Sequence, residues 1–233
     1  MNTPKFPILI LFFLFLSVVS GCSHLAQNTV IENEIQTKYR QGPGEFKKIK
    51  YDLLTFQSRQ QEEKFPLLVA FHGTGDNGPH YLGIWRREAE RRRIMVLAPT
   101  LDVIDMNALF RMVELTVQSY PIDLDRIFVA GASSGAFLAR LMVIERPSLW
   151  KKAVFVASPN DQWSSKISLK DLPPVLFVHG GRDNQFKFPS TVKRIEILKK
   201  KGLQAELKAY PHAGHEQKAE WSPAIFDWLL KES

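Results

Sequence analysis

Four short stretches of the chain each combine glycine with a side chain that can take part in catalysis. They are His72-Gly73-Thr74-Gly75-Asp76, Gly131-Ala132-Ser133-Ser134-Gly135, His179-Gly180-Gly181-Arg182-Asp183 and His212-Ala213-Gly214-His215. A serine hydroxyl is a weak nucleophile at neutral pH, so it needs a base beside it. A histidine base in turn needs an acid that fixes its tautomer and stabilises the imidazolium. These stretches contain candidates for all three groups.

Ser133 lies in a Gly-x-Ser-x-Gly pattern between a strand-like and a helix-like segment. A nucleophile elbow requires this context, because the serine occupies a strained turn and the residues two positions away must be small. Gly131 and Gly135 meet that requirement. The motif alone is equally compatible with a tight turn that has no chemistry. However, Asp183 and His215 follow Ser133 in the order serine, acid, histidine, which is the order of α/β-hydrolases.

The choice of histidine and of acid leaves alternatives open. His215 is favoured over His212, because the flexible Ala-Gly dipeptide before it lets its loop reach the serine, whereas His212 comes almost directly after a strand. Asp161, after the strand expected at 152–158, is a rival to Asp183. The sequence therefore favours His215 and Asp183 without excluding the other two.

The remaining histidines are expected to be structural. The rings of His72 and His179 are predicted to bond to nearby backbone groups. A metal site built on His212 and His215 would lack the carboxylate or cysteine ligands that complete such a site. No metal ligand is therefore predicted.

Apolar runs alternate with amphipathic segments along most of the chain. The expected strands span 46–56, 65–73, 94–99, 125–131, 152–158, 174–181 and 204–211, and the expected helices span 80–93, 105–119, 134–146, 189–201 and 219–231. Strands that are apolar throughout and alternate with helices indicate a mostly parallel sheet covered by helices on both faces. The fold class is therefore α/β, and function in such sheets collects beyond the carboxyl ends of the strands.

Composition limits the classes of protein to which the chain can belong. It has 233 residues, of which 45% are hydrophobic and 24% charged, the balance of one globular domain. The net charge of +7 comes partly from clusters at 85–93 and 198–202, which resemble the last turns of helices, where cations complement the macrodipole. No base-stacking or groove-reading motif accompanies the charge, so nucleic acid is not expected as a partner.

The N-terminal segment is predicted to direct export. Lys5 precedes an apolar run at 8–16, which is short for a membrane span and typical of a signal peptide. The run ends in Val-Ser-Gly-Cys, which resembles the lipobox of bacterial lipoproteins, with lipid carried on Cys22. Cys22 is the only cysteine of the chain. The alternative is an ordinary secretory signal with a chance cysteine.

This interpretation divides the chain into three parts. They are a signal peptide at 1–21, a lipid-anchored tether at 22–44 that is partly helical around 29–40, and a catalytic domain at 45–233. Several acyl chains on one residue would anchor the protein stably to a membrane. Ser23 resembles the pattern of lipoproteins sent to the outer membrane, so the expected location is outside the bacterial cytoplasm, on the outer membrane or facing the periplasm.

From about residue 65 onward, four blocks resemble α/β-hydrolases of the phospholipase/carboxylesterase (acyl-thioesterase) group. The blocks are HGTGDNG at 72–78, DLDRIFVAGASSGAF at 123–137, PVLFVHGGRDNQF at 174–186 and AYPHAGHE at 209–216. The same blocks resemble feruloyl esterases and polyhydroxybutyrate depolymerases. The resemblance implies an α/β-hydrolase fold without a large cap domain.

The resemblance also implies a role for each residue of the site. It makes Ser133 the nucleophile, Asp183 the orienting acid and His215 the base, with the backbone N–H groups of Thr74 and Ser134 as the oxyanion hole. The chain departs from the group's pattern at Ser134 and at Ala136. Neither change removes a catalytic group, since the oxyanion donor is a main-chain N–H, but both bear on substrate preference.

The sequence therefore predicts a serine carboxylesterase that cleaves small-molecule or acyl esters, or thioesters, without a metal or organic cofactor. No insertion is long enough for a separate lid; the segment 158–173 could form only a small flap, which favours small or soluble esters. One alternative is a peptidase or polyester depolymerase on the same fold. The other is a catalytically silent lipoprotein that binds a partner through exposed aromatic residues such as Trp85.

Overall fold

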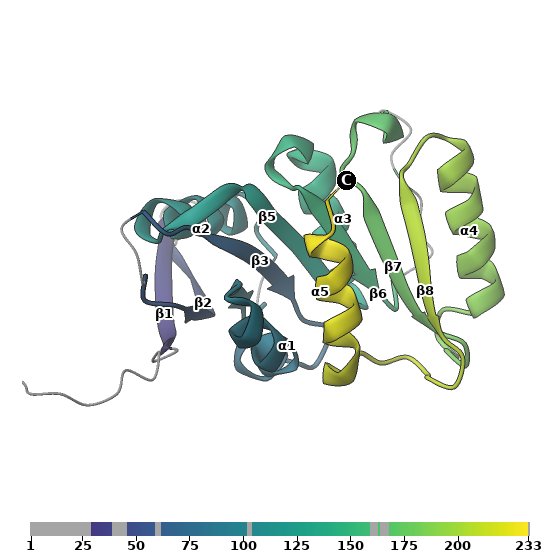
Figure 1. The fold of residues 1–233 in the computed structure, drawn as a ribbon, viewed down its shortest axis with the longest axis horizontal. Helices are drawn as coiled ribbons and strands as arrows, with labels where there is room; N and C mark the ends of the chain where they lie inside the picture. The colour runs from purple at the N-terminus through teal and green to yellow at the C-terminus, as the bar shows by residue number, and fades with distance from the viewer. Residues whose placement is uncertain are drawn as a thin grey trace, which may run out of the picture.

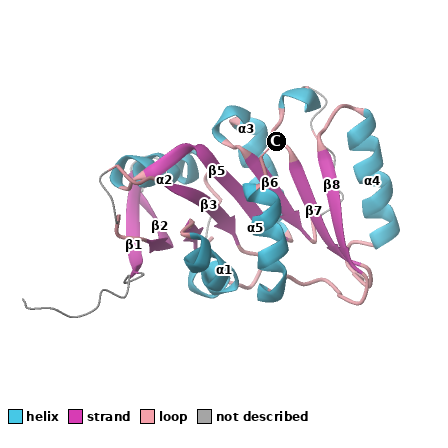
Figure 2. Cartoon of the chain, viewed as in Figure 1, coloured by secondary structure: helices cyan, strands magenta, loops and turns pink. Residues whose placement is uncertain are grey.

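The structure is a computed structural model that describes residues 29–38, 46–58, 62–101, 104–158, 163 and 168–232, with side chains from residue 49 onward. The described residues form one sheet in the order β1-β2-β4-β3-β5-β6-β7-β8 (Figures 1 and 2). The strands are β1 (Thr29–Lys38), β2 (Phe46–Thr55), β3 (Phe65–Phe71), β4 (Met95–Pro99), β5 (Ile122–Ala132), β6 (Lys152–Val156), β7 (Val175–Gly180) and β8 (Ala205–Tyr210). The pairs β1–β2 and β2–β4 are antiparallel, and all other neighbouring pairs are parallel.

Helices cover both faces of this sheet. They are α1 (Gly78–Arg92), α2 (Met106–Ser119), α3 (Ser134–Glu145), α4 (Phe188–Lys200) and α5 (Ser222–Leu230). In Figure 1, α1 and α5 lie side by side in front of the sheet, whereas α3 lies behind it, against β3, β5 and β6. This arrangement confirms the predicted α/β fold with a mostly parallel sheet. The carboxyl ends of the parallel strands therefore meet at one edge of the sheet.

The central strands owe their position to uninterrupted apolar sequence. Every residue of β3, β4, β6 and β7 is buried, including the charged Lys152 at the start of β6. Parallel strands with helices on both faces have no solvent-facing side, so alternation of polar and apolar residues is absent from them. Among the described residues, no helix is both long and apolar enough to span a bilayer.

The segment at 29–38, expected to be part of a partly helical tether, is a strand. It pairs along its whole length with β2, from Thr29 opposite Thr55 to Lys38 opposite Phe46. The helical expectation was wrong here because β2 offers an unpaired edge of backbone N–H and C=O groups, and a sequence rich in threonine, valine and isoleucine suits a strand. Residues 1–28 and 39–45, which contain the predicted signal peptide and Cys22, lie outside the described residues.

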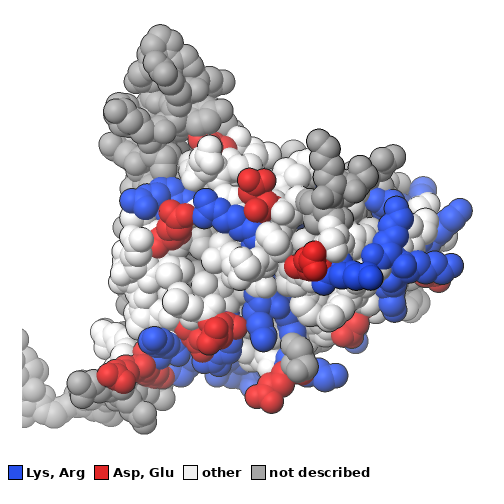
Figure 3. All heavy atoms as spheres, turned by 90° about the horizontal axis from the view of Figure 1, so that it is seen from above, with Lys and Arg blue, Asp and Glu red and all other residues white. Residues whose placement is uncertain are grey.

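The cationic clusters lie at helix ends, as predicted. Arg91 and Arg92 occupy the last turn of α1, and Lys199 and Lys200 the last turn of α4. Figure 3 shows Lys and Arg side chains gathered at the end of the molecule where α4 lies. Helix α1 stops at Arg93, which adopts a left-handed conformation (φ 56°), and α4 is followed by Gly202 (φ 100°), the expected C-terminal glycine.

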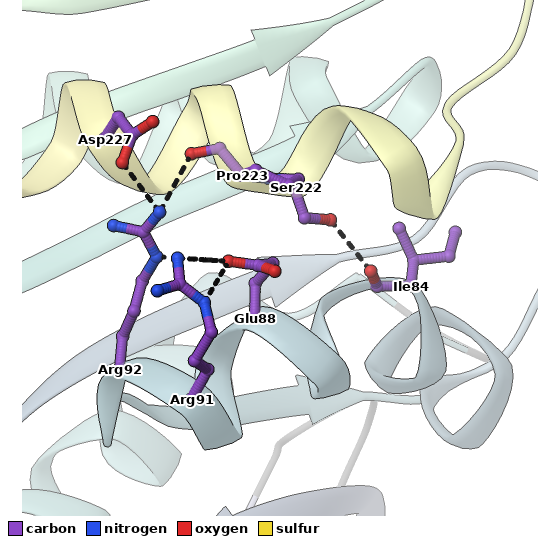
Figure 4. A network of polar contacts seen from close by, with 7 residues as sticks. All are labelled: Ile84, Glu88, Arg91, Arg92, Ser222, Pro223 and Asp227. Carbon is purple, nitrogen blue, oxygen red and sulfur yellow. Dashed lines mark hydrogen bonds and ion pairs between the residues drawn. The ribbon is translucent and has the colours of Figure 1, made fainter.

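Polar contacts tie α1 to α5 (Figure 4). The Arg92 guanidinium donates to the Asp227 carboxylate at 2.6 Å and to the carbonyl of Pro223 at 3.4 Å. The Ser222 hydroxyl donates to the carbonyl of Ile84 at 2.8 Å. These contacts fix the segment that follows the histidine loop against the front of the sheet.

Trp85 was expected among exposed aromatic residues, and that expectation was wrong. Its side chain is fully buried in α1, edge-on to Tyr81 and Phe226. The amphipathic period of α1 places Trp85 on the same face as Tyr81, four residues earlier, and that face packs on the sheet. Trp85 therefore marks the core and offers no binding surface.

Candidate active site

Ser133 stands at the turn between β5 and α3 in a conformation that side chains rarely adopt (φ 53°, ψ −119°). The residues two positions before and after it must be glycine for steric reasons. A Cβ on Gly131 would lie 2.1 Å from the carbonyl oxygen of Gly135, and a Cβ on Gly135 would lie 2.2 Å from the carbonyl oxygen of Phe71. The Ser133 amide donates to the carbonyl of Val156 in β6 at 2.9 Å, which holds the turn at the end of the sheet. This is the geometry of a nucleophile elbow.

Asp183 lies in the turn that follows β7, and its carboxylate is fully enclosed. The amides of Gln185 and Phe186 both donate to its Oδ1 at 2.8 Å. Burial opposes ionisation of this carboxyl group, but the Phe186 amide, the His215 ring and the Gln185 amide together outweigh burial and hold the pKa of Asp183 below its usual range. Asp183 is thus a carboxylate at neutral pH.

His215 connects Asp183 to Ser133. Its Nδ1 lies 2.9 Å from Asp183 Oδ2, and its Nε2 lies 2.9 Å from Ser133 Oγ. A carboxylate only accepts hydrogen bonds, so Nδ1 carries a proton and Nε2 is free to accept the serine proton. The ring packs edge-on against Phe186 at a centroid distance of 5.1 Å. The structure thus brings together the three residues favoured from the sequence.

The loop after β3 lies beside the elbow. A Cβ on Gly73 would be 3.2 Å from the carbonyl oxygen of Ala132, so the loop passes close to Ser133. The hydroxyl of Thr74 donates to the hydroxyl of Ser134 at 2.9 Å. Within the described part of the chain, neither the Thr74 nor the Ser134 amide donates a backbone hydrogen bond. Both amides belong to segments that border the serine, as the resemblance implied.

The rival histidine lies elsewhere. His212 is exposed, and its Nδ1 contacts the guanidinium of Arg182 at 3.4 Å rather than the serine. The rival acid, Asp161, lies outside the described residues, as do residues 159–162 and 164–167 of the segment 158–173. His72 is buried between two backbone groups, as expected: its Nδ1 donates to the Gly73 carbonyl at 2.8 Å, and its Nε2 accepts from the Leu101 amide at 2.9 Å.

A pocket of about 600 Å³ opens onto Ser133 and His215. Its wall includes Tyr81 from α1 and Gln217 from the histidine loop, which share a hydrogen bond from the Tyr81 hydroxyl to Gln217 Oε1 at 2.8 Å. Sequence reasoning missed both residues. Tyr81 read only as part of a helix face, and its distance of 136 positions from Gln217 gives no local signal that the two meet.

His179 is the other residue whose surroundings the sequence did not indicate. It was expected to bond to backbone, and its Nε2 does lie 2.7 Å from the carbonyl oxygen of Phe186. The same Nε2 lies 3.4 Å from Asp183 Oδ2. The available signal for this contact was the spacing of four residues between His179, near the end of β7, and Asp183. Among the described residues, no group of three or more His, Cys, Asp and Glu side chains is placed to hold a metal ion.

A mostly parallel sheet with an antiparallel edge, an elbow serine and a histidine held by an acid define an α/β-hydrolase. The sequence profile of the dienelactone hydrolase family matches residues 81–223, and the chain belongs to that family. This membership confirms the predicted resemblance to hydrolases of this fold. No curated protein sequence matches the chain.

Solved structures with the same fold include several esterases. A thermostable esterase is 20% identical over 85% of this chain, which spans only 62% of that protein, with a TM-score of 0.66. The S-formylglutathione hydrolase of Staphylococcus aureus is 15% identical, with 88% of this chain and 98% of that chain covered and a TM-score of 0.67. A ferulic acid esterase is 13% identical, with coverage of 88% and 97% and a TM-score of 0.68. The family and the fold together place this chain among the carboxylesterase-type hydrolases.

Proposed function

We propose that this protein is a serine esterase that acts through an acyl-enzyme on Ser133. The observation that carries the proposal is the continuous hydrogen-bonded series from Asp183 through His215 to Ser133, with 2.9 Å at both contacts of the histidine ring. Structural turns do not need such a series. The contact between His215 Nε2 and Ser133 Oγ lies within the range at which a base accepts a proton from its nucleophile, and the contact to Asp183 orients that base.

The first half of the reaction transfers the acyl group to the enzyme. Ser133 Oγ attacks the ester carbonyl carbon while His215 Nε2 takes the hydroxyl proton. The carbonyl oxygen becomes an oxyanion, which the amides of Thr74 and Ser134 stabilise by hydrogen bonds. Removal of one such donor costs about 10²–10³ in kcat in other enzymes. Collapse of the intermediate breaks the ester C–O bond, and the imidazolium gives its proton to the leaving alcohol.

The second half regenerates the enzyme. A water molecule gives a proton to His215 Nε2 and attacks the acyl carbon, and the serine oxygen leaves with the proton that the histidine returns. Throughout, Asp183 keeps the ring in one tautomer and stabilises its charged form without taking the proton itself. Because its hydrogen bonds outweigh burial and keep Asp183 ionised, this stabilisation is available at neutral pH.

The pocket supports small or soluble esters and thioesters as substrates. Its volume of about 600 Å³ is typical of sites for small molecules. Polar side chains, among them Asp76, His80 and Glu216, share its wall with the apolar Ile84 and Ala157. The S-formylglutathione hydrolase is named for a thioester substrate and the ferulic acid esterase for an ester substrate, so both kinds of leaving group belong in the test.

The test compares wild type with Ser133→Ala on a series of p-nitrophenyl acyl esters, one acyl thioester and one aminoacyl amide, with fluorophosphonate labelling of both proteins. We expect hydrolysis of short-chain esters and labelling of wild type, and loss of both in Ser133→Ala. Turnover of the amide at a rate similar to that of the esters would favour the peptidase alternative. A folded wild-type protein that the fluorophosphonate does not label would refute the proposal and favour a silent binding protein.

We further propose that Cys22 carries lipid and holds the protein on a bacterial membrane outside the cytoplasm. The support is the sequence pattern alone, in which Lys5, the apolar run at 8–16 and the lone cysteine stand in lipoprotein order. The test expresses the full chain in bacteria with an alkyne-tagged palmitate. Wild type should be labelled and sediment with outer membranes, and Cys22→Ser should do neither. Labelled or membrane-bound Cys22→Ser would refute the anchor.

A further inference from the structure

His179 is a buried histidine in contact with the machinery of the site, and the mechanism above assigns it no part. Its side chain has 1% relative exposure. It is the last residue but one of strand β7, four residues before Asp183, and its ring is tilted against Phe188 of α4 at a centroid distance of 6.1 Å. A buried polar ring is retained at a cost unless its nitrogens are satisfied, so its partners indicate its role.

The Nε2 atom of His179 faces three oxygen atoms. The nearest is the carbonyl oxygen of Phe186 at 2.7 Å; Asp183 Oδ2 and Thr191 Oγ1 both lie at 3.4 Å. A carbonyl oxygen can only accept a hydrogen bond, so Nε2 must carry a proton. The Nε2–H group of His179 is therefore directed at the Phe186 carbonyl oxygen, next to the Asp183 carboxylate that holds His215.

Phe186 contacts His179, the acid and the base. Its amide donates to Asp183 Oδ1 at 2.8 Å, and its ring packs edge-on against the His215 ring. One residue thus touches the acid through its main chain and the base through its side chain. Fixing the Phe186 carbonyl fixes both contacts at once, because amide, carbonyl and ring leave the same short segment of backbone.

We infer that His179 is a positioning residue for the Asp183–His215 pair, a role that rests on the proposed esterase function. Its N–H holds the Phe186 carbonyl, which aims the Phe186 amide at Asp183 and its ring at His215. The second contact of His179, to Asp183 Oδ2, restrains the same oxygen that accepts the hydrogen bond from His215 Nδ1. Without His179 the acid loop could rotate, and the His215 ring would lose its fixed orientation toward Ser133.

The size of the effect is bounded by known cases. Loss of the correct histidine tautomer in a serine triad costs about 10⁴ in kcat, whereas a misplacement of about 1 Å costs about 10². His179 acts at one remove from the base, so we expect its loss to lower kcat about 10- to 100-fold. KM for a small ester should change little, since His179 does not line the pocket.

The experiment uses the full chain with p-nitrophenyl acetate as substrate and a fluorophosphonate as probe of the nucleophile. His179→Leu removes the donor at similar volume, and His179→Gln keeps an N–H group near the position of Nε2. Phe188→Leu is the packing control, because it loosens the same contact without touching a polar group of the site. Each variant is measured for kcat, KM, labelling rate, melting temperature and the pH profile of kcat/KM.

The expected result separates positioning from stability. His179→Leu should lose about 10- to 100-fold in kcat and in labelling rate, and the acid limb of its pH profile should move to lower pH, because a less firmly held carboxylate stabilises the imidazolium less. Among the described residues, His179 faces the Asp183 carboxylate, and Asp76, His80 and Glu216 line the pocket beside His215. His179→Gln should stay within about threefold of wild type, and Phe188→Leu should melt earlier with kcat and pH profile unchanged.

Three outcomes would overturn the inference. One is a His179→Leu variant that keeps wild-type kcat and pH profile; the second is one whose activity loss merely equals its unfolded fraction. If His179→Leu does not fold, His179→Asn replaces it, because its amide is too short to reach Phe186. The third outcome that would overturn the inference is an equal kcat for the His179→Asn and His179→Gln variants. A wild-type protein that the probe fails to label refutes the esterase proposal itself, and that result is distinct from an active wild type with indifferent His179 variants.

Discussion

Thr74 donates its hydroxyl proton to the hydroxyl of Ser134 across 2.9 Å, linking the loop after β3 to the first residue of α3. These two residues are separated by 60 positions in the sequence, and both belong to segments that border Ser133. The link is made by side chains, whereas the proposed oxyanion donors are main-chain groups. The departure at Ser134 from the pattern of similar hydrolases therefore has a structural counterpart in Thr74.

The hydrogen bond between the Thr74 and Ser134 hydroxyls should hold the two proposed oxyanion-hole amides in position without itself contacting the oxyanion. Thr74→Val removes the donor and keeps the shape, and we expect kcat on a p-nitrophenyl ester to fall about 2- to 10-fold, the equivalent of one ordinary hydrogen bond of about 0.5–1.5 kcal/mol. Ser134→Ala should lose a similar amount, and the double variant no more than either, because both break one contact. Additive losses would mean that the hydroxyls act separately.

The elbow depends on glycine at 135, which can be tested by adding a single methyl group. Gly135→Ala would place a Cβ 2.2 Å from the Phe71 carbonyl and 2.5 Å from the His72 carbonyl, both of them backbone atoms that cannot give way cheaply. We expect destabilisation of about 1–3 kcal/mol or more and loss of most activity, measured by urea unfolding and ester hydrolysis.

Gly83→Ala is the matched control. Gly83 is exposed within α1, and its added Cβ would meet nothing within 4 Å. Alanine is the better helix former, so this variant should gain about 0.5–1 kcal/mol with activity unchanged. A Gly135→Ala variant as stable and active as Gly83→Ala would show that the turn relaxes more easily than its contacts indicate.

Asp183 should make stability depend on pH in one direction. Its pKa is held below the usual value by hydrogen bonds that outweigh burial. A carboxyl group with a depressed pKa in the folded state stabilises the fold above its unfolded pKa of about 4, and this contribution is lost as pH falls through the folded value. The free energy of unfolding of wild type relative to Asp183→Asn should therefore be level between about pH 7 and 5 and decline below about pH 4.

Urea unfolding at several pH values measures this difference. Ser133→Ala is the control, since it keeps the carboxylate and should show the wild-type dependence on pH. Asp183→Asn should also lose about 10³–10⁴ in kcat at neutral pH, because an amide cannot stabilise the imidazolium. A stability difference that stays constant down to pH 2 would contradict the depressed pKa.

Much of the fold was predictable because its signals are local. The strands β3, β6 and β7 are mostly apolar and are buried at every position, a pattern that indicates a parallel sheet covered on both faces in a chain of alternating strands and helices. The same holds for the elbow, where Gly131, Ser133 and Gly135 identify the turn by spacing alone. The structure of residues 29–38 was predicted wrongly, because an amphipathic polar sequence suits either a helix or an edge strand. Only the free edge of β2 decides between the two.

The site was predictable as far as strand ends could be placed. Ser133, Asp183 and His215 each follow a strand, so the topology brought them together before any distance was known. What lies around them depends on contacts between distant segments. Trp85 resembled a surface aromatic until the packing of α1 against Phe226 buried it, and the position of His179 against Phe186 depends on how one loop folds back.

Tyr81 offers a test of the pocket that leaves the triad intact. Tyr81 is 1% exposed, and its hydroxyl donates to Gln217 Oε1 at 2.8 Å. Burial together with the charge of Asp76 raises the pKa of Tyr81 far above its ordinary value, so the hydroxyl remains a donor at any working pH. Tyr81→Phe should cost about 0.5–1.5 kcal/mol, because the hydrogen bond to the half-buried Gln217 is lost. Release of Gln217 should raise KM for p-nitrophenyl esters about 2- to 5-fold at unchanged kcat.

Tyr120→Phe is the control, because Tyr120 is half-buried and lies outside the pocket, and it should alter neither kcat nor KM. A fall in kcat with constant KM in Tyr81→Phe would instead show that the Tyr81 hydroxyl stabilises the transition state.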